Sequence, residues 1–189
     1  MKLLAWNCCG LGSARAVRAL LEVRRRLNPD VWFLSETHLD NAKADNIRRR
    51  AGFDHLLVHE SDGRSGGLVL MWRDDISIQV QGITKNYIDV IIDNGVSWRF
   101  IGVYGDPEWN QKHVTWEALR SIKGDLNTPW LLMGDFNEIL YNMEKEGGRP
   151  RPQRQMQAFH DVLSECNLND MGFLGGSLYL AARTTQGKT

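Results

Sequence analysis

Cysteine is scarce in this chain of 189 residues, and the few cysteines have no metal-binding or redox spacing. The three are Cys8, Cys9 and Cys166, an odd number without a Cys-x-x-Cys pair. This usage argues against a disulfide framework and against a zinc knuckle. It is typical of a reducing compartment, so we expect an intracellular protein.

Long apolar runs and a surplus of either charge are also missing. No run approaches the ~20 apolar residues of a transmembrane helix, and the first run meets Asn7 too early for a signal peptide. Lysine plus arginine and aspartate plus glutamate number 23 each, so no overall positive field favours nucleic acid. We expect no membrane contact, and any nucleic-acid binding must be local.

What is present is an ordinary globular composition. Apolar residues make up 42% of the chain and charged residues 24%, with seven tryptophans, which excludes a disordered chain. The length fits one domain with a substantial core. Because no linker divides the sequence, we expect residues 1–189 to form a single domain.

Apolar periodicity and turn residues predict a chain of alternating helices and strands. Helices are expected at 13–27, 41–51, 109–123 and 153–166, and strands at 3–6, 30–36, 53–60, 66–73, 75–82, 86–93, 97–104, 129–134 and 177–182. The strand–helix–strand–helix opening favours parallel pairing. Asn94-Gly95 is a hairpin signal, so an antiparallel stretch is expected in the middle of the chain.

Four of the apolar runs end in a polar residue. Asn7, Glu36, Tyr104 and Asp135 follow or close these runs, and Asn137 lies two residues beyond Asp135. Ligands of open α/β sheets collect outside the carboxyl ends of strands. Carboxylate and carbonyl oxygens suit a hard divalent cation such as Mg²⁺, and the set has none of the sulfur and paired imidazoles of zinc sites.

Several short segments resemble a known family in order and rough spacing. They are Trp6-Asn7-Cys8-Cys9-Gly10-Leu11-Gly12, Ser35-Glu36-Thr37, Ser65-Gly66-Gly67-Leu68 with Met71-Trp72, Val103-Tyr104-Gly105, and Gly134-Asp135-Phe136-Asn137-Glu138. The chain is identified by them as a member of the endonuclease/exonuclease/phosphatase superfamily. Residues 98–105, 129–130 and 169–173 make it most similar to endonuclease domains of plant LINE-type (non-LTR) retroelements.

This resemblance implies both a fold and an activity. The fold is an α/β four-layer sandwich, DNase I-like, with two mixed β-sheets face to face and helices outside. The activity is hydrolysis of a phosphodiester with Mg²⁺, for which Mn²⁺ could substitute, in a DNA endonuclease that nicks its target. DNA would be the partner, in the nucleus, and a longer parent protein would contain a reverse transcriptase module.

The resemblance also assigns roles to the five strand-end residues. Glu36 would be the principal metal ligand, with Asn7 beside it and Asp135 also in the metal site. Asp135 would orient or deprotonate the attacking water, Asn137 would hold that water or a phosphoryl oxygen, and Tyr104 would donate its hydroxyl to the phosphate. Neutral donors and a metal offset the charge that grows in the transition state.

The sequence departs from the family pattern near its end. Tyr179-Leu180 stands where the family has Thr-Trp, and the family's Arg-Leu-Asp and Ser-Asp-His segments are missing. We therefore expect a sandwich that is incomplete at the C-terminus, and loss of a general acid or base typically costs ~10²–10⁴ in rate. Two alternatives stay open: an inactive remnant that binds only metal or nucleic acid, and a phosphatase acting on a small phosphate ester.

Basic residues and histidines near the site complete the expectations. Arg149, Arg151 and Arg154 follow the Asp135 loop and are interpreted as contacts to nucleic-acid phosphates. The arginine runs 24–26 and 48–50 close two expected helices and are interpreted as solvent-exposed partners of the helix dipole. His38, two residues after Glu36, is interpreted as a solvent-facing loop residue.

Overall fold

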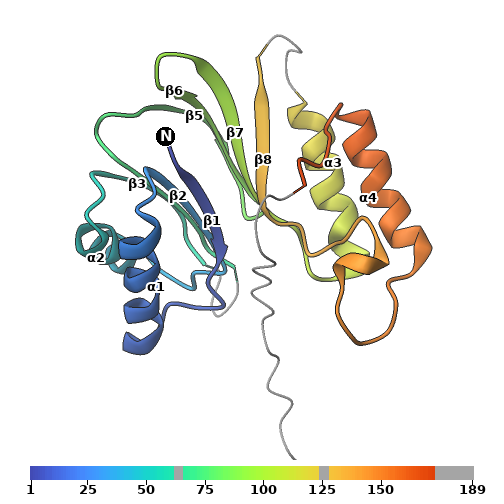
Figure 1. Ribbon diagram of the computed structural model, residues 1–189, viewed down its shortest axis with the longest axis horizontal. Coiled ribbons are helices and arrows are strands. Elements are labelled where there is room, and N and C mark those ends of the chain that lie inside the picture. Colours follow the sequence, from blue (N-terminus) through green and yellow to red (C-terminus); the bar gives the residue numbers. More distant parts are fainter. Residues whose placement is uncertain (62–65, 124–127, 173–189) are drawn as a thin grey trace, which may run out of the picture.

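A computed structural model describes residues 1–61, 66–123 and 128–172, which form two β-sheets with two α-helices outside each (Figure 1). The elements, in chain order, are β1 (Leu3–Asn7), α1 (Ala14–Leu27), β2 (Val31–Ser35), α2 (Asn41–Ala51), β3 (His55–His59), β4 (Leu68–Trp72), β5 (Ser77–Ile83), β6 (Tyr87–Asp93), β7 (Ser97–Tyr104), α3 (Lys112–Ile122), β8 (Trp130–Asp135) and α4 (Gln153–Glu165). Short 3₁₀ turns precede α3 at Trp109–Gln111 and α4 at Asn142–Glu144.

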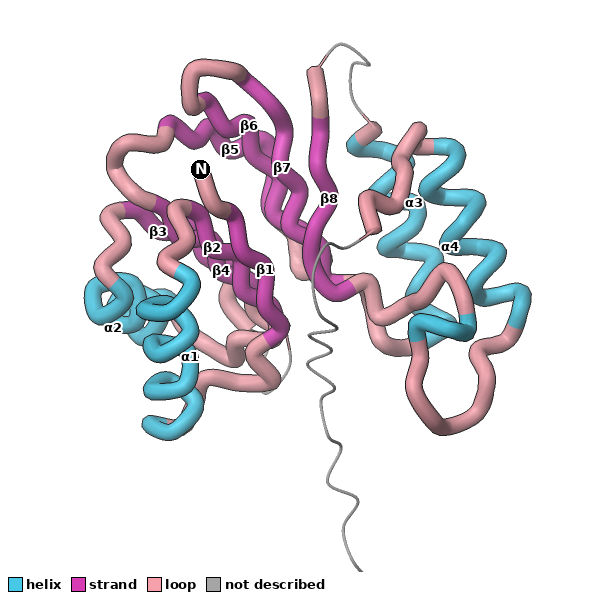
Figure 2. Tube along the Cα trace, in the orientation of Figure 1, coloured by secondary structure: helices cyan, strands magenta, loops and turns pink. Residues whose placement is uncertain are grey.

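Both sheets are mixed, as expected for the sandwich (Figure 2). The first has the order β1-β2-β4-β3, in which β1 and β2 are parallel and the other pairs antiparallel. The second has the order β5-β6-β7-β8, in which only β7 and β8 are parallel. The parallel opening and the antiparallel hairpin at Asn94-Gly95 are therefore confirmed.

The first two helices begin and end at the residues that the sequence predicts. The side chain of Ser13 accepts a hydrogen bond from the Ala16 N–H at the start of α1, and Asp40 does the same for Lys43 in α2. Gly52 ends α2 in the left-handed region, where a glycine is favoured. Local capping chemistry thus fixes where these helices stop.

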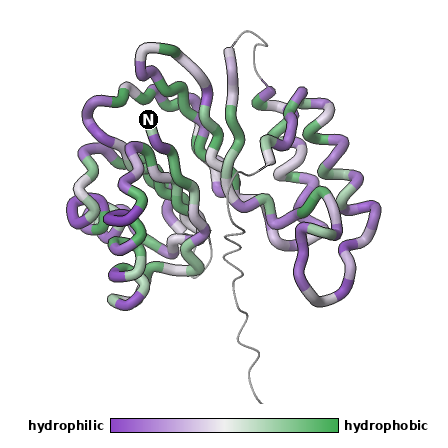
Figure 3. Tube along the Cα trace, viewed as in Figure 1, coloured by the Kyte–Doolittle hydropathy of each residue, from purple (hydrophilic) through white to green (hydrophobic). Residues whose placement is uncertain are grey.

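Three apolar layers hold the sandwich together, and β2 contributes to two of them. Trp32 and Leu34 pack toward α1 and α2, whereas Val31 and Phe33 pack between the two sheets. All four side chains are fully buried, because successive residues point to opposite faces of β2 and both faces are covered. A third apolar layer lies between the second sheet and α3 and α4. The apolar colouring of the strands and the polar outer faces of the helices follow this plan (Figure 3).

The remaining differences from expectation are small. The helix expected from Trp109 starts as a 3₁₀ turn and becomes α-helical only at Lys112. Asp135 is the last residue of β8, one residue beyond the expected strand. The strand expected at 177–182 lies outside the described residues. Within the described ranges, no helix is long and apolar enough to cross a membrane.

Candidate active site at the ends of four strands

The carboxyl ends of two parallel strand pairs meet at one edge of the sandwich. In the first sheet Asn7 is paired in register with Ser35, the residue before Glu36. In the second sheet Tyr104 is paired in register with Asp135. The strands β1 and β8 lie side by side across the sheets, with their carboxyl ends close together (Figure 1). Strand pairing within each sheet, together with the packing of β1 against β8 between the sheets, therefore brings these side chains to one place.

Asp135 is the centre of the hydrogen bonding at this edge. Its Oδ2 accepts a hydrogen bond from Asn7 Nδ2 at 2.7 Å, which links the two sheets. Its Oδ1 accepts one from the Asn137 N–H at 2.8 Å, and Asn137 Nδ2 donates to the Gly105 carbonyl at 2.7 Å. Both carboxylate oxygens are thus oriented by named donors.

The Tyr104 hydroxyl links the second sheet to Glu36 by donating a hydrogen bond to Glu36 Oε1. Burial raises the pKa of Tyr104 well above its ordinary value, and the hydrogen bond to Glu36 and the charges of Glu36 and Asp135 add to the effect. The phenol is therefore a proton-bearing donor at physiological pH. Glu36 is hydrogen-bonded to Tyr104, whose partner in register on β8 is Asp135, so the two carboxylates belong to the same edge of the sandwich.

The main chain around these residues adopts an unusual conformation. Cys9, Glu36, His38 and Asn137 all have positive φ, between 47° and 54°. Non-glycine residues rarely adopt this region, which costs of order 1 kcal/mol or more each and concentrates at functional sites. Only two further non-glycine residues with positive φ occur in the described ranges, and both follow helices. The conformational strain is therefore concentrated at this edge.

A close contact of two backbones explains the glycine after Tyr104. The Gly105 N–H donates to the Asp135 carbonyl at 2.8 Å. A Cβ at position 105 would lie 2.1 Å from the Phe136 carbonyl oxygen, a distance that only glycine avoids. This contact keeps the Asp135 loop against the end of β7.

The donor set fits a hard divalent cation. Glu36, Asn7 and Asp135 offer two carboxylates and one amide carbonyl, and Mg²⁺ uses few protein carboxylates and keeps several waters. Asn7 Oδ1 already accepts the Cys9 N–H at 3.0 Å. Among the residues described, no three His, Cys, Asp or Glu side chains form a cluster that could bind a metal ion. The protein would therefore supply only a few of the ligands.

The three arginines expected to contact phosphates, two in the loop before α4 and one in its first turn, occupy different environments. Arg151 is only 34% exposed and pairs with the fully buried carboxylate of Glu138, with Nε 2.8 Å from Oε1. Arg149 is exposed, and Arg154 is exposed with its guanidinium 5.7 Å from the Trp109 ring centre. Two of the three expected phosphate contacts therefore face solvent, and the third is mostly engaged within the protein.

The sequence analysis assigned no role to two charged residues that are buried against the loop after Asp135. Lys112 and Glu138 are buried next to Asn137, and neither was assigned a role. The one available signal was a lysine near the start of an amphipathic helix, which is ordinary in a sequence. His38 lies in a loop, as expected, but it is half-buried against Gly10 rather than fully exposed to solvent.

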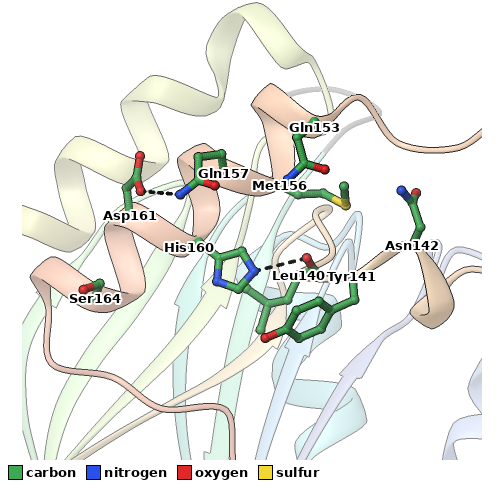
Figure 4. A pocket seen from close by; sticks show the side chains of 9 residues that line it. All are labelled: Leu140, Tyr141, Asn142, Gln153, Met156, Gln157, His160, Asp161 and Ser164. Atoms are coloured by element: carbon green, nitrogen blue, oxygen red, sulfur yellow. Dashed lines mark hydrogen bonds between the residues drawn. The ribbon is translucent and has the colours of Figure 1, made fainter.

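A shallow pocket next to this edge lies between α4 and the loop that follows Asn137 (Figure 4). The His160 ring contacts the Leu140 carbonyl through Nε2 at 3.2 Å, and Gln157 donates to Asp161 at 2.9 Å. None of the five strand-end residues lines this pocket. It is a separate surface feature, and the candidate site is the open strand edge itself.

Two mixed sheets packed face to face, with helices outside and polar side chains at one edge, define a DNase I-like fold. A 3′-5′ exonuclease from Neisseria meningitidis matches with a TM-score of 0.63 and 21% identity, over 87% of this chain and 71% of that one. An AP endonuclease from Leishmania major matches with a TM-score of 0.64 and 14% identity, over 88% and 66%. D. rerio TDP2 complexed with single strand DNA product matches with a TM-score of 0.56 and 19% identity, over 74% and 61%.

The sequence matches a protein family over almost its full length. No curated protein matches the chain. The model of the endonuclease/exonuclease/phosphatase family matches residues 4–185, nearly the whole sequence. The chain therefore belongs to the endonuclease/exonuclease/phosphatase family.

Proposed function

We propose that this protein is a divalent-metal-dependent phosphodiester hydrolase that nicks DNA, of the type encoded by non-LTR retroelements. The observation that carries the proposal is two hydrogen-bonded groups at one edge of the sandwich: Asn7 and Asn137 with Asp135, and Tyr104 with Glu36. Family membership and the retroelement-like segments of the sequence support it. A nuclear location and a reverse transcriptase module in a longer parent protein belong to the same proposal.

Each side chain has a role that its surroundings support. Asp135, held by Asn7 and by the Asn137 N–H, orients the attacking water and takes its proton. Tyr104 stays protonated and donates to a phosphoryl oxygen, and the Asn137 amide holds the water or a second oxygen. These donors neutralise charge that appears on the phosphate as the bond to the leaving group breaks.

Glu36, Asn7 and Asp135 would hold the cation, for which Mg²⁺ fits their oxygen chemistry and Mn²⁺ is a substitute. A bound divalent cation supplies polarisation of the phosphoryl oxygen and stabilisation of the leaving oxygen. Glu36 Oε1 accepts the Tyr104 hydroxyl in this structure. Because a phenol has one proton to donate, that hydroxyl would turn from Glu36 to the phosphate when cation and substrate bind.

A plasmid-nicking assay tests the proposal. Purified protein is incubated with supercoiled plasmid and Mg²⁺, and the conversion to the open-circular form is measured. We expect Glu36→Ala and Asp135→Ala each to lower the rate by roughly 10² or more. Glu22→Ala is the control, because Glu22 pairs with Arg25 on the exposed surface of α1 and should leave the rate unchanged.

Two outcomes would redirect the assignment. If the wild-type protein nicks no faster than Glu36→Ala, endonuclease activity is excluded. A calorimetric Mg²⁺ titration then tests the inactive remnant, which predicts binding that Glu36→Ala abolishes. If plasmid is inert but a soluble phosphate ester is hydrolysed, the phosphatase alternative takes its place.

A further inference from the structure

Lys112 occupies a position that is unfavourable for a lysine in two respects. It is the first residue of α3, where the positive end of the helix dipole disfavours a cation. Only 2% of its surface is exposed, and burial of an ammonium group is costly unless it is paired. Burial also lowers the pKa of Lys112, an effect that the nearby Glu138 carboxylate opposes. A lysine that is unfavourable both for the helix dipole and for burial is expected to make a compensating interaction elsewhere in the structure.

The compensation comes from the segment directly after β8. Lys112 Nζ lies 2.5 Å from the Asn137 carbonyl oxygen and 3.5 Å from the Phe136 carbonyl oxygen. Arg151 Nη2 approaches the same Asn137 oxygen at 3.5 Å. Two cations therefore converge on one main-chain carbonyl of the loop that carries Asp135.

Glu138 supplies the opposite charge for both cations. Its fully buried carboxylate lies 3.5 Å from Lys112 Nζ and 2.8 Å from Arg151 Nε. Neither contact is aligned as a hydrogen bond, since Glu138 Oε2 and Arg151 Nε have no hydrogen-bond partner in the described structure. The carboxylate thus acts by charge, while the short directional contact is the one from Lys112 to Asn137.

Holding the Asn137 carbonyl in place also restricts the orientation of its N–H and of its side-chain amide. With its carbonyl held inward, Asn137 adopts a φ of 51°, and its N–H and side-chain amide point to Asp135 and Gly105. We propose that Lys112 is a positioning residue, which holds Asn137 and through it Asp135 in the geometry required for phosphodiester hydrolysis. This inference rests on the proposed function and adds a residue to it.

Lys123 provides a matched control on the same helix. It follows the last turn of α3, and its Nζ donates to the Glu165 carbonyl at 2.6 Å. Lys123 is therefore also a lysine bound to a main-chain carbonyl, but one on the surface and outside the hydrogen-bonded set of the site. Lys123→Met removes the same chemistry without touching the Asp135 loop.

Two variants of the full chain test Lys112. Lys112→Met keeps the side-chain length and leaves Glu138 paired with Arg151. Lys112→Met/Glu138→Gln removes both buried charges, and replacing a whole buried pair is often neutral where removing one partner is not. Arg151 is 34% exposed, so water can compensate its charge in the double variant.

The two readouts are hydrogen exchange of the peptide that contains Asn137 and steady-state nicking kinetics. We expect both variants to exchange roughly tenfold faster at this segment, because a charge-assisted hydrogen bond is lost. We also expect kcat to fall by up to roughly 10²-fold while KM for DNA is unchanged, since displacement of reacting groups by about 1 Å has that effect. Lys123→Met should match the wild-type protein in both measurements.

Exchange at the wild-type rate in both variants would overturn the inference, and so would faster exchange with unchanged kcat. Faster exchange with a reduced kcat supports it. If the wild-type chain does not nick DNA at all, the proposed function fails by itself. The hold of Lys112 on Asn137 is then judged by exchange, with faster exchange in both variants supporting it and wild-type exchange overturning it.

Discussion

Tyr104 shows at the scale of one residue how burial and charge select a role. Its hydroxyl donates to Glu36, and its environment opposes formation of the phenolate. A tyrosine with an ordinary pKa of about 10 is already a donor at neutral pH. The raised pKa means that Tyr104 keeps its proton beside two carboxylates, so in the proposed reaction it would be a donor to the phosphate and not the base.

This state of Tyr104 can be measured by titration. The absorbance of tyrosinate is followed from pH 8 upward in the wild-type protein and in Tyr104→Phe. Because the folded-state pKa of Tyr104 is raised, we expect no difference between the two curves near pH 10, where an ordinary tyrosine ionises. The stabilising effect of the raised pKa is fully present below about pH 10 and is lost as pH rises toward the folded-state pKa. A wild-type excess of about half a tyrosinate at pH 10, where a group with a pKa of about 10 is half ionised, would contradict this assignment.

At the scale of elements, the close packing of β2 against β7 between the two sheets requires a glycine at position 102. A Cβ at Gly102 would lie 2.4 Å from the Phe33 ring, in the layer between the two sheets. The ring therefore fills the space that a side chain on β7 would need. Strand patterning predicts that position 102 lies in a strand, but not that an aromatic ring from another sheet lies on it.

Gly102→Ala should consequently destabilise the protein by roughly 1–3 kcal/mol through overpacking. Chemical denaturation measures the effect, with Gly82→Ala as the control, since a Cβ there meets the Tyr87 ring at an ordinary 3.6 Å. Phe33→Leu added to Gly102→Ala should recover part of the loss. Equal stability of the two alanine variants would show that the sheets adjust to the extra methyl group.

The sequence predicts elements well where the signal is local. The helix of 41–51 begins after Asp40 and ends before Gly52 because capping and left-handed φ depend on neighbouring residues. The strand ends that carry Asn7, Glu36, Tyr104 and Asp135 are also visible as polar residues after apolar runs. The four-layer fold then follows from the family resemblance rather than from the pattern alone.

Contacts between distant segments could not be predicted in the same way. Lys112 and Asn137 are 25 residues apart, and only the packing of α3 against the end of β8 brings the ammonium group to that carbonyl. The environment of Arg151 has the same origin, because its partner Glu138 becomes buried only in the folded sandwich. Side chains whose role is to hold a loop leave no pattern of spacing in the sequence.

At the scale of the whole molecule, charge balance makes the position of each arginine important. Basic and acidic residues are equal in number, so under the proposed function DNA affinity would depend on local contacts rather than on a general field. Arg149 and Arg154 are exposed in the loop and helix start that follow the site. The arginines that end α1 and α2 lie at the opposite edge, where Val31, Trp72 and His55 are paired in register.

Salt-dependent DNA binding separates these two groups of arginines. Binding to a short duplex is measured in EDTA, so that no cleavage occurs, over a range of salt concentrations. Each phosphate contact contributes about 0.9 to the slope of log K against log salt, so Arg149→Ala/Arg154→Ala should lower that slope by roughly 2. Arg25→Ala/Arg50→Ala removes the same charge at the opposite edge and should leave the slope almost unchanged. Because the net charge of the two double variants is identical, an equal loss in both would mean that DNA senses the total charge and not the loop beside the site.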